Sequence, residues 1–595
     1  MSDILWLVLF AALFITIPYT YYKKGIKTSI AVAYAFAVII FARLFYEEQG
    51  IKASLISLVF SAQLFTFGVN GRELFEVVSH VSDAVSTSFI ACVWLCYIVC
   101  PILTVSVVLV YIKRGLDRTA IKTRFFKDVY IFTERNENTL LLAQDICSDK
   151  KRVVVFANND SFDVGLRLLC VPYTASDVCN MLNKTNKVHI CFNDTDTGVL
   201  LDNLTTLLEK EKLTKENDIY VFSDNAIAHE VIDGIKKKHS YKTIKVISTN
   251  AILMREILWD YPLYSNMHQK DEINVTVMGV GDFGGYFAMN TLWCATLPDC
   301  PLRLNLVDMD TKDNILRRVS DNINDGDFDI RVFNENINTN TFFDKIASNR
   351  IYNSDYILVA MGNDDLNISV SRKLRLFFAR CKRHPFIITV IKNQSKFDVM
   401  SEALKTDDIA IVGGKENIHS YKSIFEDRFF QRAFKVYQIV ENHYNNYPGE
   451  NDFYKQNQID IFSSYANAIH SKYKVFSIMN EADLSIEKAK CILNTNCEIF
   501  DKTVRSEHDR WVAFEMLKGY VGVPDGDIDA FLAMNHENGG KLHKNTALKM
   551  HACITEFDNL DVIDQKICDI CNKDPNLKEI DVLITKNTFS IYSGE

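Results

Sequence analysis

Two apolar segments near the start of the chain, Ile4–Tyr22 and Ser29–Tyr46, each approach the length needed to cross a lipid bilayer. A hydrocarbon layer of about 30 Å requires roughly 20 consecutive apolar residues in a helix. A third segment, Ser86–Ile112, is longer and contains Pro101, so a tilted or bent span is expected. No basic region precedes the first segment, which is therefore expected to remain in the mature chain. Residues 1–112 are predicted to form an α-helical membrane domain.

Positive charge sets the expected orientation of these spans. The segment Lys113–Lys127, directly after the third span, is rich in Lys and Arg. The positive-inside rule places this basic linker, and everything that follows it, in the cytoplasm. The loop Lys23–Lys27 prefers the same side, which favours three spans with an outside N-terminus over four spans. We therefore expect a multi-pass protein of the cell inner membrane, in contact with membrane lipid, with a large cytoplasmic C-terminal region.

The segment Ser54–Gly71 lies between the second and third spans and allows two interpretations. One is a fourth span with its loop. The other is a re-entrant pore loop whose end, TFGVNG, resembles in part the potassium-channel filter signature TVGYG. Thr66 and Gly68 match that signature, whereas Asn70 breaks its second step and Gly71 stands one place late. Because such filters replace the ion's hydration shell with backbone carbonyls, Thr66, Gly68 and Gly71 are candidate pore residues.

Charge and cysteine content narrow the class of partner. The formal net charge is -9 and the isoelectric point is near 5.9. Nucleic-acid-binding surfaces need clustered Lys and Arg to displace counterions, so nucleic acid is not expected as a partner. The 15 cysteines are scattered without a disulfide framework, which fits a reducing compartment. Cys568 and Cys571 have metal-binding spacing, but no second pair follows, so no metal site is predicted.

From Asp128 onward, short β-rich runs alternate with amphipathic helices, as in a parallel sheet with helical crossovers. Residues 128–268 are predicted to form one Rossmann-like, doubly wound unit. Its expected strands are Val129–Phe132, Val153–Phe156, Val188–Phe192, Ile219–Phe222 and Ile244–Ile247, and its expected helices are Thr139–Cys147, Leu200–Glu211, Ala226–Lys238 and Ala251–Trp259. The first turn, Thr133–Thr139, contains no glycine, so its backbone is poorly suited to approach a phosphate. We expect a degenerate nucleotide fold here.

Residues 269–417 are predicted to form a second Rossmann-like unit with a glycine-rich first turn. The stretch INVTVMGVGDFGGYFAMN places a strand, then Gly279-x-Gly281-x-x-Gly284, then an apolar helix. In this context the first glycine makes the turn, the second admits a phosphate, and the third lets the helix pack against the strand. The helix begins near Asp282 and Phe283, where free N–H groups favour an anion. A ligand-binding phosphate cradle is expected, although the glycines alone would also serve helix packing.

Polar residues at the ends of neighbouring strands complete this predicted site. Asp308 and Asp310 end the next strand, where a carboxylate would accept hydrogen bonds from a ribose diol. Gly362 and Asn363 end the fourth strand and are expected to face the same crevice. A nucleotide or dinucleotide, either NAD-like or of the cyclic-nucleotide type, is the expected ligand. No acid or base is placed beside it as a dehydrogenase would require, so no catalytic residue is assigned and the chain is not expected to be an enzyme.

The segments VYIFTERNENTLLLAQDI, VTVMGVGDFGGYFAMN, LNLVDMD and YILVAMGNDDLN together resemble the RCK/KTN (TrkA-N-like) units that regulate potassium channels and transporters. The resemblance covers residues 126–417 and implies cytoplasmic nucleotide-sensing units behind a membrane domain. Because such folds host many functions, the resemblance implies the fold more firmly than the activity.

Residues 418–595 are expected to be mostly helical, with a small strand or hairpin at the tail. The segment SEHDRWVAFEMLKGY and the later FDNL turn resemble the ryanodine-receptor repeat (RyR) domain, over about residues 453–564. The resemblance implies an aromatic and cationic face that suits an anionic, base-bearing ligand. The candidate ligand-binding residues are Glu507, His508, Arg510, Trp511, Lys549 and His551. Any one of them taken alone is better explained as a core residue or as the partner of a buried polar group.

The expected fold is thus an α-helical membrane domain, two tandem doubly wound parallel sheets and a helical RyR-like domain. The function that fits this order is a ligand-gated membrane effector or potassium-channel-like ion channel, controlled by a nucleotide in the cytoplasm. Few spans per chain require several subunits around a pore, so a homo-oligomer, with a tetramer favoured, is expected. The resemblance also implies a role in antiviral defence. The alternatives are a membrane-anchored nucleotide-dependent enzyme and a non-conducting receptor that perturbs the membrane.

Overall fold

The computed structural model describes most of the chain, with short gaps. The described residues are Val8, Thr16 and Ile17, and residues 26–66, 68–81, 87–122, 128–159, 168–171, 173–182, 187–209, 217–240, 242–264, 272–321, 328–404, 409–479, 485–539, 541–571 and 576–594. The predicted first span, Ile4–Tyr22, lies outside them apart from three positions. The chain forms two compact units, residues 1–125 with 160–164, and residues 126–159 with 165–595.

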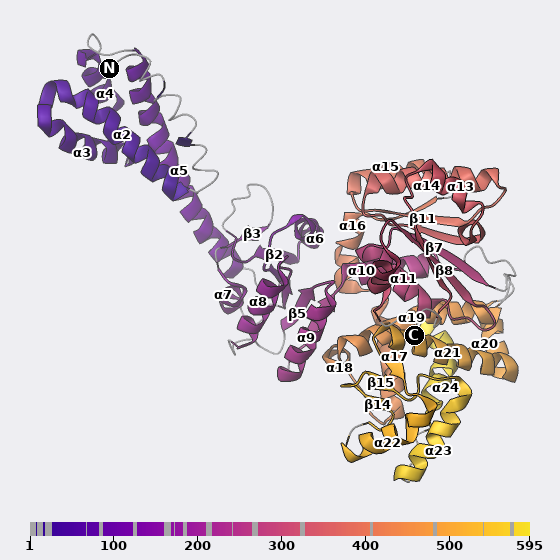
Figure 1. The fold of residues 1–595 in the computed structure, drawn as a ribbon. Helices are drawn as coiled ribbons and strands as arrows, with labels where there is room; N and C mark the ends of the chain where they lie inside the picture. Colours follow the sequence, from indigo (N-terminus) through magenta and orange to yellow (C-terminus); the bar gives the residue numbers. More distant parts are fainter. Residues whose placement is uncertain are drawn as a thin grey trace. The chain divides into compact units, whose positions relative to one another are not determined.

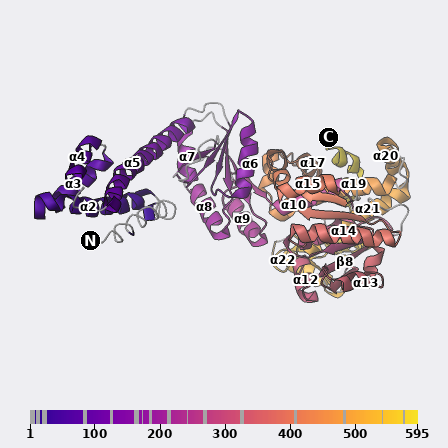
Figure 2. The same cartoon turned by 90° about the horizontal axis from the view of Figure 1, so that it is seen from above.

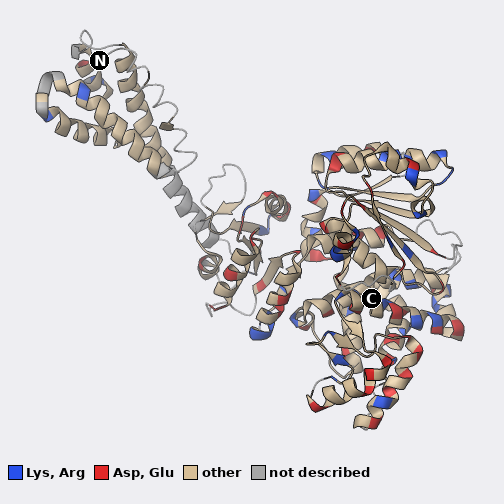
Figure 3. Ribbon diagram, viewed as in Figure 1, with Lys and Arg blue, Asp and Glu red and all other residues tan. Residues whose placement is uncertain are grey.

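The first unit is helical and its surface is largely apolar. Its helices are α2 (Ile26–Gln49), α3 (Ala53–Phe65), α4 (Gly71–Val81) and α5 (Thr87–Lys122), with a short 3-10 turn at Gly50–Lys52. Figure 3 shows few charged residues along α2 and α3. Two segments, Thr28–Tyr46 and Thr87–Val108, are long and apolar enough to cross a membrane by length and composition. They coincide with the predicted second and third spans. Phe41, Phe89 and Cys92 are among the side chains that form the core between the helices.

Helix α5 does not end where the third span was expected to end. It continues past Ile112 as far as Lys122, so most of the predicted basic linker is helical. Residues 123–127 lie outside the described part of the chain, and β1 begins at Asp128.

The candidate pore segment forms a short helix and a turn. Helix α3 has 13 residues, which at about 1.5 Å per residue is ~20 Å and too short to cross a ~30 Å hydrocarbon layer. The interpretation of Ser54–Gly71 as a fourth span therefore does not fit α3. The amides of Thr66 and Gly68 both donate to the Gln63 carbonyl, at 3.1 and 2.8 Å. Gly71 begins α4, where an added Cβ would lie 2.9 Å from the Tyr97 hydroxyl oxygen. Ion conduction through this turn stays a prediction.

The second unit begins with a six-stranded parallel sheet in the order β3-β2-β1-β4-β5-β6. Its strands are β1 (Asp128–Phe132), β2 (Arg152–Phe156), β3 (Leu169–Cys170), β4 (Val188–Phe192), β5 (Asn217–Phe222) and β6 (Ile244–Ile247). The crossover helices are α6 (Glu137–Ser148), α7 (Ala175–Met181), α8 (Thr197–Glu209), α9 (Ala226–Lys238) and α10 (Thr249–Asp260). The prediction of a doubly wound unit is confirmed. Strand β3 and helix α7 were not predicted, because they are too short to show a periodic pattern.

A second six-stranded parallel sheet follows, in the order β12-β11-β10-β7-β8-β9. Its strands are β7 (Ile273–Met278), β8 (Leu302–Asp308), β9 (Ile330–Asn334), β10 (Tyr356–Val359), β11 (Phe386–Ile391) and β12 (Ile409–Gly413). Its helices are α11 (Asp282–Cys294), α12 (Lys312–Val319), α13 (Asn340–Ile346), α14 (Asp364–Arg380) and α15 (Gln394–Ala403). Figure 2 shows α14 lying across this sheet, and α11 packs into the core on the other face. Both sheets have the strand order of Rossmann folds, which confirms two tandem units.

The C-terminal region is mostly helical, as predicted, and carries one small sheet. Its longer helices are α17 (Phe430–His443), α19 (Gln458–Met479), α20 (Ile486–Thr495), α21 (Cys497–Leu517), α22 (Ile528–Glu537) and α23 (Leu560–Cys571). Its shorter elements are α16 (Lys415–Ile418), a π-helical turn (Lys422–Glu426), α18 (Glu450–Lys455), α24 (Glu579–Lys586), α25 (Thr588–Ser593) and β13 (Val521–Gly522), β14 (Lys544–Asn545) and β15 (Met550–His551). Figure 1 shows these helices against the second sheet, and α11, α19 and α21 share one hydrophobic core.

The expected strand or hairpin at the tail is wrong. The tail forms α24 and α25, and its buried residues include Asp581, Ile584, Thr585 and Thr588. Their spacing of three, four and seven residues is the period of a helix face. The β-branched side chains suggested a strand, but packing against α19 and α21 decides the conformation.

Candidate functional site

The carboxyl ends of β7, β8 and β10 surround a cavity of about 310 Å³ in the second Rossmann unit. The strand order reverses between β7 and β10, and ligands of open α/β sheets bind at such a switch point. Gly279, Gly281, Asp282, Phe283, Asp308 and Gly362 all line this cavity. Six of the nine residues predicted for this site are therefore brought to one place. The other three do not line it. Gly284 packs against the Gly279 carbonyl behind the turn, Asp310 pairs with Arg318, and Asn363 caps α14.

Each glycine of the first turn has a distinct steric reason. Gly279 has φ +86°, and an added Cβ would lie 2.6 Å from the Cα atom of Met361. At Gly284 an added Cβ would lie 1.9 Å from the Gly279 carbonyl oxygen, so the helix can approach the strand only without a side chain. Gly281 is different, because nothing lies within 4 Å of its added Cβ. The turn and the packing thus need the first and third glycines, while the second one faces open space where a ligand can approach the backbone.

The start of α11 supplies hydrogen-bond donors to this space. Gly281 is the N-cap residue and offers no side-chain cap. Within the part of the chain that the structure describes, the backbone amides of Asp282, Phe283 and Gly284 have no acceptor. The first N–H groups of a helix have no partner inside the helix, and the helix dipole favours negative charge there. The geometry suits a phosphate group, although the Asp282 carboxylate in the first turn opposes an anion in part.

Asp308 and Asp310 have different surroundings. The Asp308 carboxylate accepts from the amides of Val280 and Met309, both at 2.7 Å, and so braces the glycine-rich turn from the end of β8. Arg318 of α12 donates to the Val280 carbonyl at 3.1 Å and forms an ion pair with Asp310. Arg318 also lies 3.6 Å from the Asp308 carboxylate, but of the two aspartates only Asp308 lines the cavity. Asp308 keeps lone pairs for a ribose diol, whereas Asp310 is better described as the partner of Arg318.

The turn after β10 closes the cavity on its other side. Gly362 has φ +77° and lies on the cavity wall. Asn363 does not face the crevice; its side chain caps α14 by accepting from the Leu366 amide at 3.0 Å. Asn367 lies behind the turn, accepts from the Met361 amide at 2.8 Å and donates to the Val390 carbonyl at 2.8 Å. This buried amide ties β10 to β11 and sets the position of Gly362.

Lys392, Asn338 and Asn367 also line the cavity, but they were not predicted from the sequence. Lys392 is an exposed cation directly after β11, and Asp364 accepts from its backbone amide at 3.0 Å. The position of Lys392 at the carboxyl end of a central strand was the signal that could have identified it. Asn338 follows β9. The sequence did not predict β9, a short strand with no fully buried residue, so Asn338 was not placed at a strand end.

A wider cleft of about 850 Å³ adjoins the same turn. One wall is the carboxyl edge of the first sheet, with Asn136, Asn193 and Asp224, and the other includes Gly281 and Asp282 of the second Rossmann unit. Residues Gly281, Asp282 and Lys392 line both this cleft and the smaller cavity. A ligand whose phosphate sits at the turn therefore has room on two sides.

In the first Rossmann unit, the protein's own side chains fill the equivalent turn. The Asn193 side-chain oxygen accepts from the amides of Thr133 and Glu134, both at 3.1 Å. The Asn193 side-chain nitrogen donates to the Glu134 carbonyl at 2.6 Å, and the Glu134 carboxylate accepts from the Thr195 hydroxyl at 2.8 Å. These bonds occupy the donors that a phosphate would use, which agrees with the expectation of a degenerate first turn.

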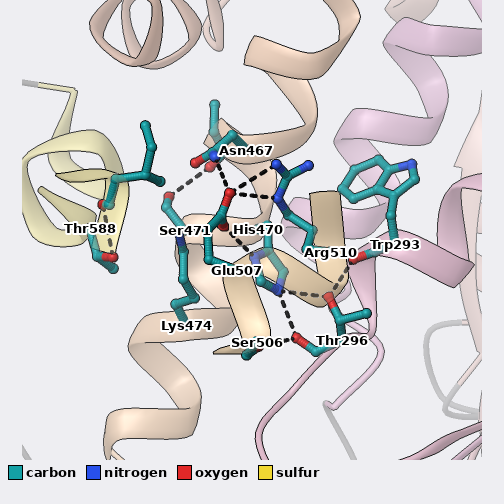
Figure 4. A network of polar contacts seen from close by, with 12 residues as sticks. Trp293, Thr296, Asn467, His470, Ser471, Lys474, Ser506, Glu507, Arg510 and Thr588 are labelled. Carbon is teal, nitrogen blue, oxygen red and sulfur yellow. Dashed lines mark hydrogen bonds and ion pairs between the residues drawn. The ribbon is translucent and has the colours of Figure 1, made fainter. Parts of the chain in front are cut away.

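The six residues predicted for the RyR-like site lie in different surroundings. Glu507 and Arg510 are 1% and 2% exposed and form a buried ion pair at 2.9 Å on α21. Figure 4 shows that Lys474 and Asn467 of α19 converge on the same carboxylate. Burial alone would raise the pKa of Glu507, but Arg510 and Lys474 outweigh it and hold that pKa well below its usual range. Glu507 and Arg510 are therefore internal partners of each other rather than open ligand groups.

His508 is also committed to internal bonds. Its ring nitrogens lie 3.0 Å from the Asp581 carboxylate and 2.9 Å from the Thr555 carbonyl. Burial lowers the pKa of His508, but the bond to Asp581 more than offsets this and the pKa is raised. Trp511 and His551 pack edge to face with ring centroids 4.9 Å apart. Lys549 lies 5.1 Å over the Tyr520 ring. Of the six residues, only Trp511 and Lys549 are partly exposed, and the other four are buried. Ligand binding by the six residues stays a prediction.

Gly284→Ala is expected to lower the free energy of unfolding by about 1–3 kcal/mol, because the new methyl group would overlap the Gly279 carbonyl and push α11 from β7. Gly281→Ala is the matched control and should change stability little, since its Cβ meets open space. Thermal melting of the two purified variants against the parent protein measures the difference. Equal melting temperatures for both variants would contradict the assigned role of Gly284.

Comparison with known proteins yields distant structural matches only. No model of a protein family matches the chain, and a search of curated proteins finds no match. A solved structure described as GsuK bound to ADP is 16% identical, with a TM-score of 0.34, over 67% of this chain and 96% of that one. A GsuK channel structure is 12% identical, with a TM-score of 0.32, over 65% and 80%. An N-terminal ketoreductase from a macrolactin assembly line is 10% identical, with a TM-score of 0.17, over 55% and 77%.

Proposed function

We propose that the chain is a nucleotide-sensing membrane effector, in which a nucleotide bound at the second Rossmann unit controls the apolar helices. The observation that carries this proposal is the open face of Gly281 beside unpartnered amides at the start of α11. Such a turn at a switch point holds a phosphate by backbone donors and the helix dipole. Asp308 at the adjacent strand end suits the ribose, and the cavity of about 310 Å³ receives the base.

The ligand class follows from the two spaces that meet at the turn. The cavity is large enough for a nucleoside, and the cleft of about 850 Å³ beyond Asp282 leaves room for a second phosphate or a second nucleoside. A nucleoside diphosphate or a dinucleotide such as NAD fits this arrangement. Lys392 borders both spaces and would offset ligand charge.

The described helices of the first unit supply the effector part of the proposal. Thr28–Tyr46 and Thr87–Val108 would span the membrane, and α5 would connect them mechanically to the nucleotide-binding unit. With so few spans per chain, a pore requires several copies, and a tetramer is the symmetric arrangement we favour. Potassium is the proposed ion because of Thr66 and Gly68, and a role in antiviral defence is part of the same proposal. No catalytic step is proposed at this cavity, whose titratable lining residues are Asp282, Asp308, Asp364 and Lys392.

Flux through liposomes tests the proposal. The full chain, reconstituted in potassium-loaded vesicles, is expected to release potassium when ADP or NAD is added outside, and to remain closed without either. Nucleotide consumption in the same vesicles is followed by chromatography. Turnover of nucleotide without flux would replace the proposed sensor with an enzyme, and binding without flux or turnover would leave only a non-conducting receptor.

A further inference from the structure

A second cavity, of about 190 Å³, lies between the first sheet and the C-terminal helices. Its walls come from β5 and β6 on one side, α10 on another, and α17, α18 and α19 on the third. It shares no lining residue with the nucleotide cavity. Its volume is more than ten times the roughly 10–15 Å³ that one buried water requires. The cavity is therefore large enough to hold a small organic molecule.

Arg255 of α10 is the unusual residue in this cavity. It is 8% exposed, yet within the described residues its guanidinium makes no hydrogen bond, and its buried Nε has no partner. Its nearest carboxylate, Asp427, is 3.9 Å away and already accepts from the Tyr465 hydroxyl at 2.6 Å. A buried charge that lacks hydrogen bonds costs several kcal/mol, so a fold rarely retains one without a use.

Two more polar groups face the same space. The Gln458 side chain is 3% exposed, and its amide nitrogen has no partner among the described residues. Lys245 of β6 makes only a 3.5 Å contact with the Tyr220 hydroxyl and lies 4.7 Å over the Tyr454 ring. Burial lowers the pKa of Lys245, and the carboxylates of Asp218 and Glu450 offset this only in part. These donors come from three separate elements and converge on one cavity.

The remaining walls are aromatic. Six aromatic side chains line the cavity: Tyr220, Phe425, Phe430, Tyr454, Phe462 and Tyr465. Arg255 itself lies 4.2 Å over the Tyr465 ring, which fixes the plane of its guanidinium. Flat rings on several sides favour a flat ligand body, and the fork of a guanidinium matches the two oxygens of a carboxylate. Glu426 and Glu450 line the rim of the cavity and are exposed.

We propose that this cavity, the Arg255 cavity, binds a small planar carboxylate, with the carboxylate on Arg255 and the ring between the tyrosines. The Gln458 side chain forms a hydrogen bond with a substituent on that ring. Lys245, on another wall of the cavity, adds positive charge. A ligand held there touches the first sheet and the C-terminal helices at once, so it stabilises their contact. The proposal is independent of the nucleotide cradle.

Benzoate is the probe for the test, with benzamide as its neutral counterpart and inorganic phosphate as the alternative oxyanion. Saturation-transfer NMR on the full chain in detergent micelles measures the dissociation constant of each. Benzoate is expected to bind at least tenfold more tightly than benzamide. Arg255→Met is expected to weaken benzoate at least tenfold, while its melting temperature is unchanged or higher, because a buried uncompensated charge has been removed.

The matched control is Arg428→Met, which removes an exposed arginine whose ion pair with Asp260 lies outside the Arg255 cavity. It should leave benzoate affinity unchanged, as should Gly281→Val, which alters only the nucleotide cradle. Equal binding of benzoate and benzamide, full benzoate binding by Arg255→Met, binding of phosphate alone, or ordered waters at Arg255 in saturating benzoate would each overturn the proposal. A marked fall in the melting temperature of Arg255→Met would also overturn it, because the arginine would then be structural.

Discussion

Gly281→Val is expected to reduce the affinity for ADP or NAD at least 100-fold, while the protein keeps its melting temperature. Nothing lies within 4 Å of an added Cβ at Gly281, and its φ of -79° is open to any residue, so the branched side chain fits the fold. It then fills the space from which a phosphate would reach the amides of Asp282 and Phe283. A 100-fold loss corresponds to about 2.7 kcal/mol of binding free energy. Calorimetric titration of the purified full chain measures it.

Gly526→Val provides the matched control. Gly526 lies in the 3-10 turn before α22, and an added Cβ there also meets no atom within 4 Å. This variant carries the same chemical change far from the cradle and should bind nucleotide like the parent. Unchanged affinity in Gly281→Val would show that the cradle is not the nucleotide site. A similar loss in both variants would mean that the effect is not local.

Glu507→Gln is expected to lower the free energy of unfolding by about 3–5 kcal/mol. Its carboxylate holds Lys474 and Arg510, both at 2.9 Å, and all three side chains are at most 3% exposed. The neutral amide would leave two cations in the interior with no counter-charge. The same network includes His470, which lies 2.8 Å from the Thr296 carbonyl at the end of α11. Loss of this network should therefore loosen the contact between α11 and the C-terminal helices.

The contribution of Glu507 to the free energy of unfolding should depend on pH in one direction. The folded-state pKa of Glu507 is depressed well below its usual range, so its stabilisation is present above the unfolded pKa of about 4.5 and is lost as the pH falls through the folded value. The difference between the parent and Glu507→Gln should be largest near neutral pH and should shrink in acid. Denaturant unfolding from neutral pH down to about pH 2 checks this, because the loss is expected below the unfolded pKa. Glu498→Gln, an exposed change on the same helix, should stay within about 0.5 kcal/mol.

The alternation of strands and helices in both Rossmann units could be predicted because its causes are local. A run such as INVTVM is rich in β-branched residues, which favour a strand. Asn, Ser or Thr residues stand before several helices and cap them, so both kinds of element are visible in the sequence. The glycine spacing at 279, 281 and 284 is equally local, since it is set by one turn and one helix. These features allowed the cradle to be located before its neighbours were known.

The surroundings of Glu507, Arg510 and Arg255 depend on distant parts of the chain. A motif that reads EHDRW predicts one helix, but it does not say whether a charged face meets solvent or meets Lys474 from α19. The terminal helices α24 and α25 replaced an expected strand for the same reason, since β-branched residues favour a strand only until packing on α19 and α21 outweighs that preference.

For this protein, the positions of strands and helices along the chain and the phosphate-binding turn follow from short-range steric and hydrophobic patterns. Which charges are buried, which cavities stay open and which groups lack partners follow from contacts between residues about 30 to 280 positions apart, such as Lys474 with Glu507 and Tyr421 with Asp145. Burial and Coulomb energies depend on distance in space and not on distance in sequence, so only the folded arrangement decides them.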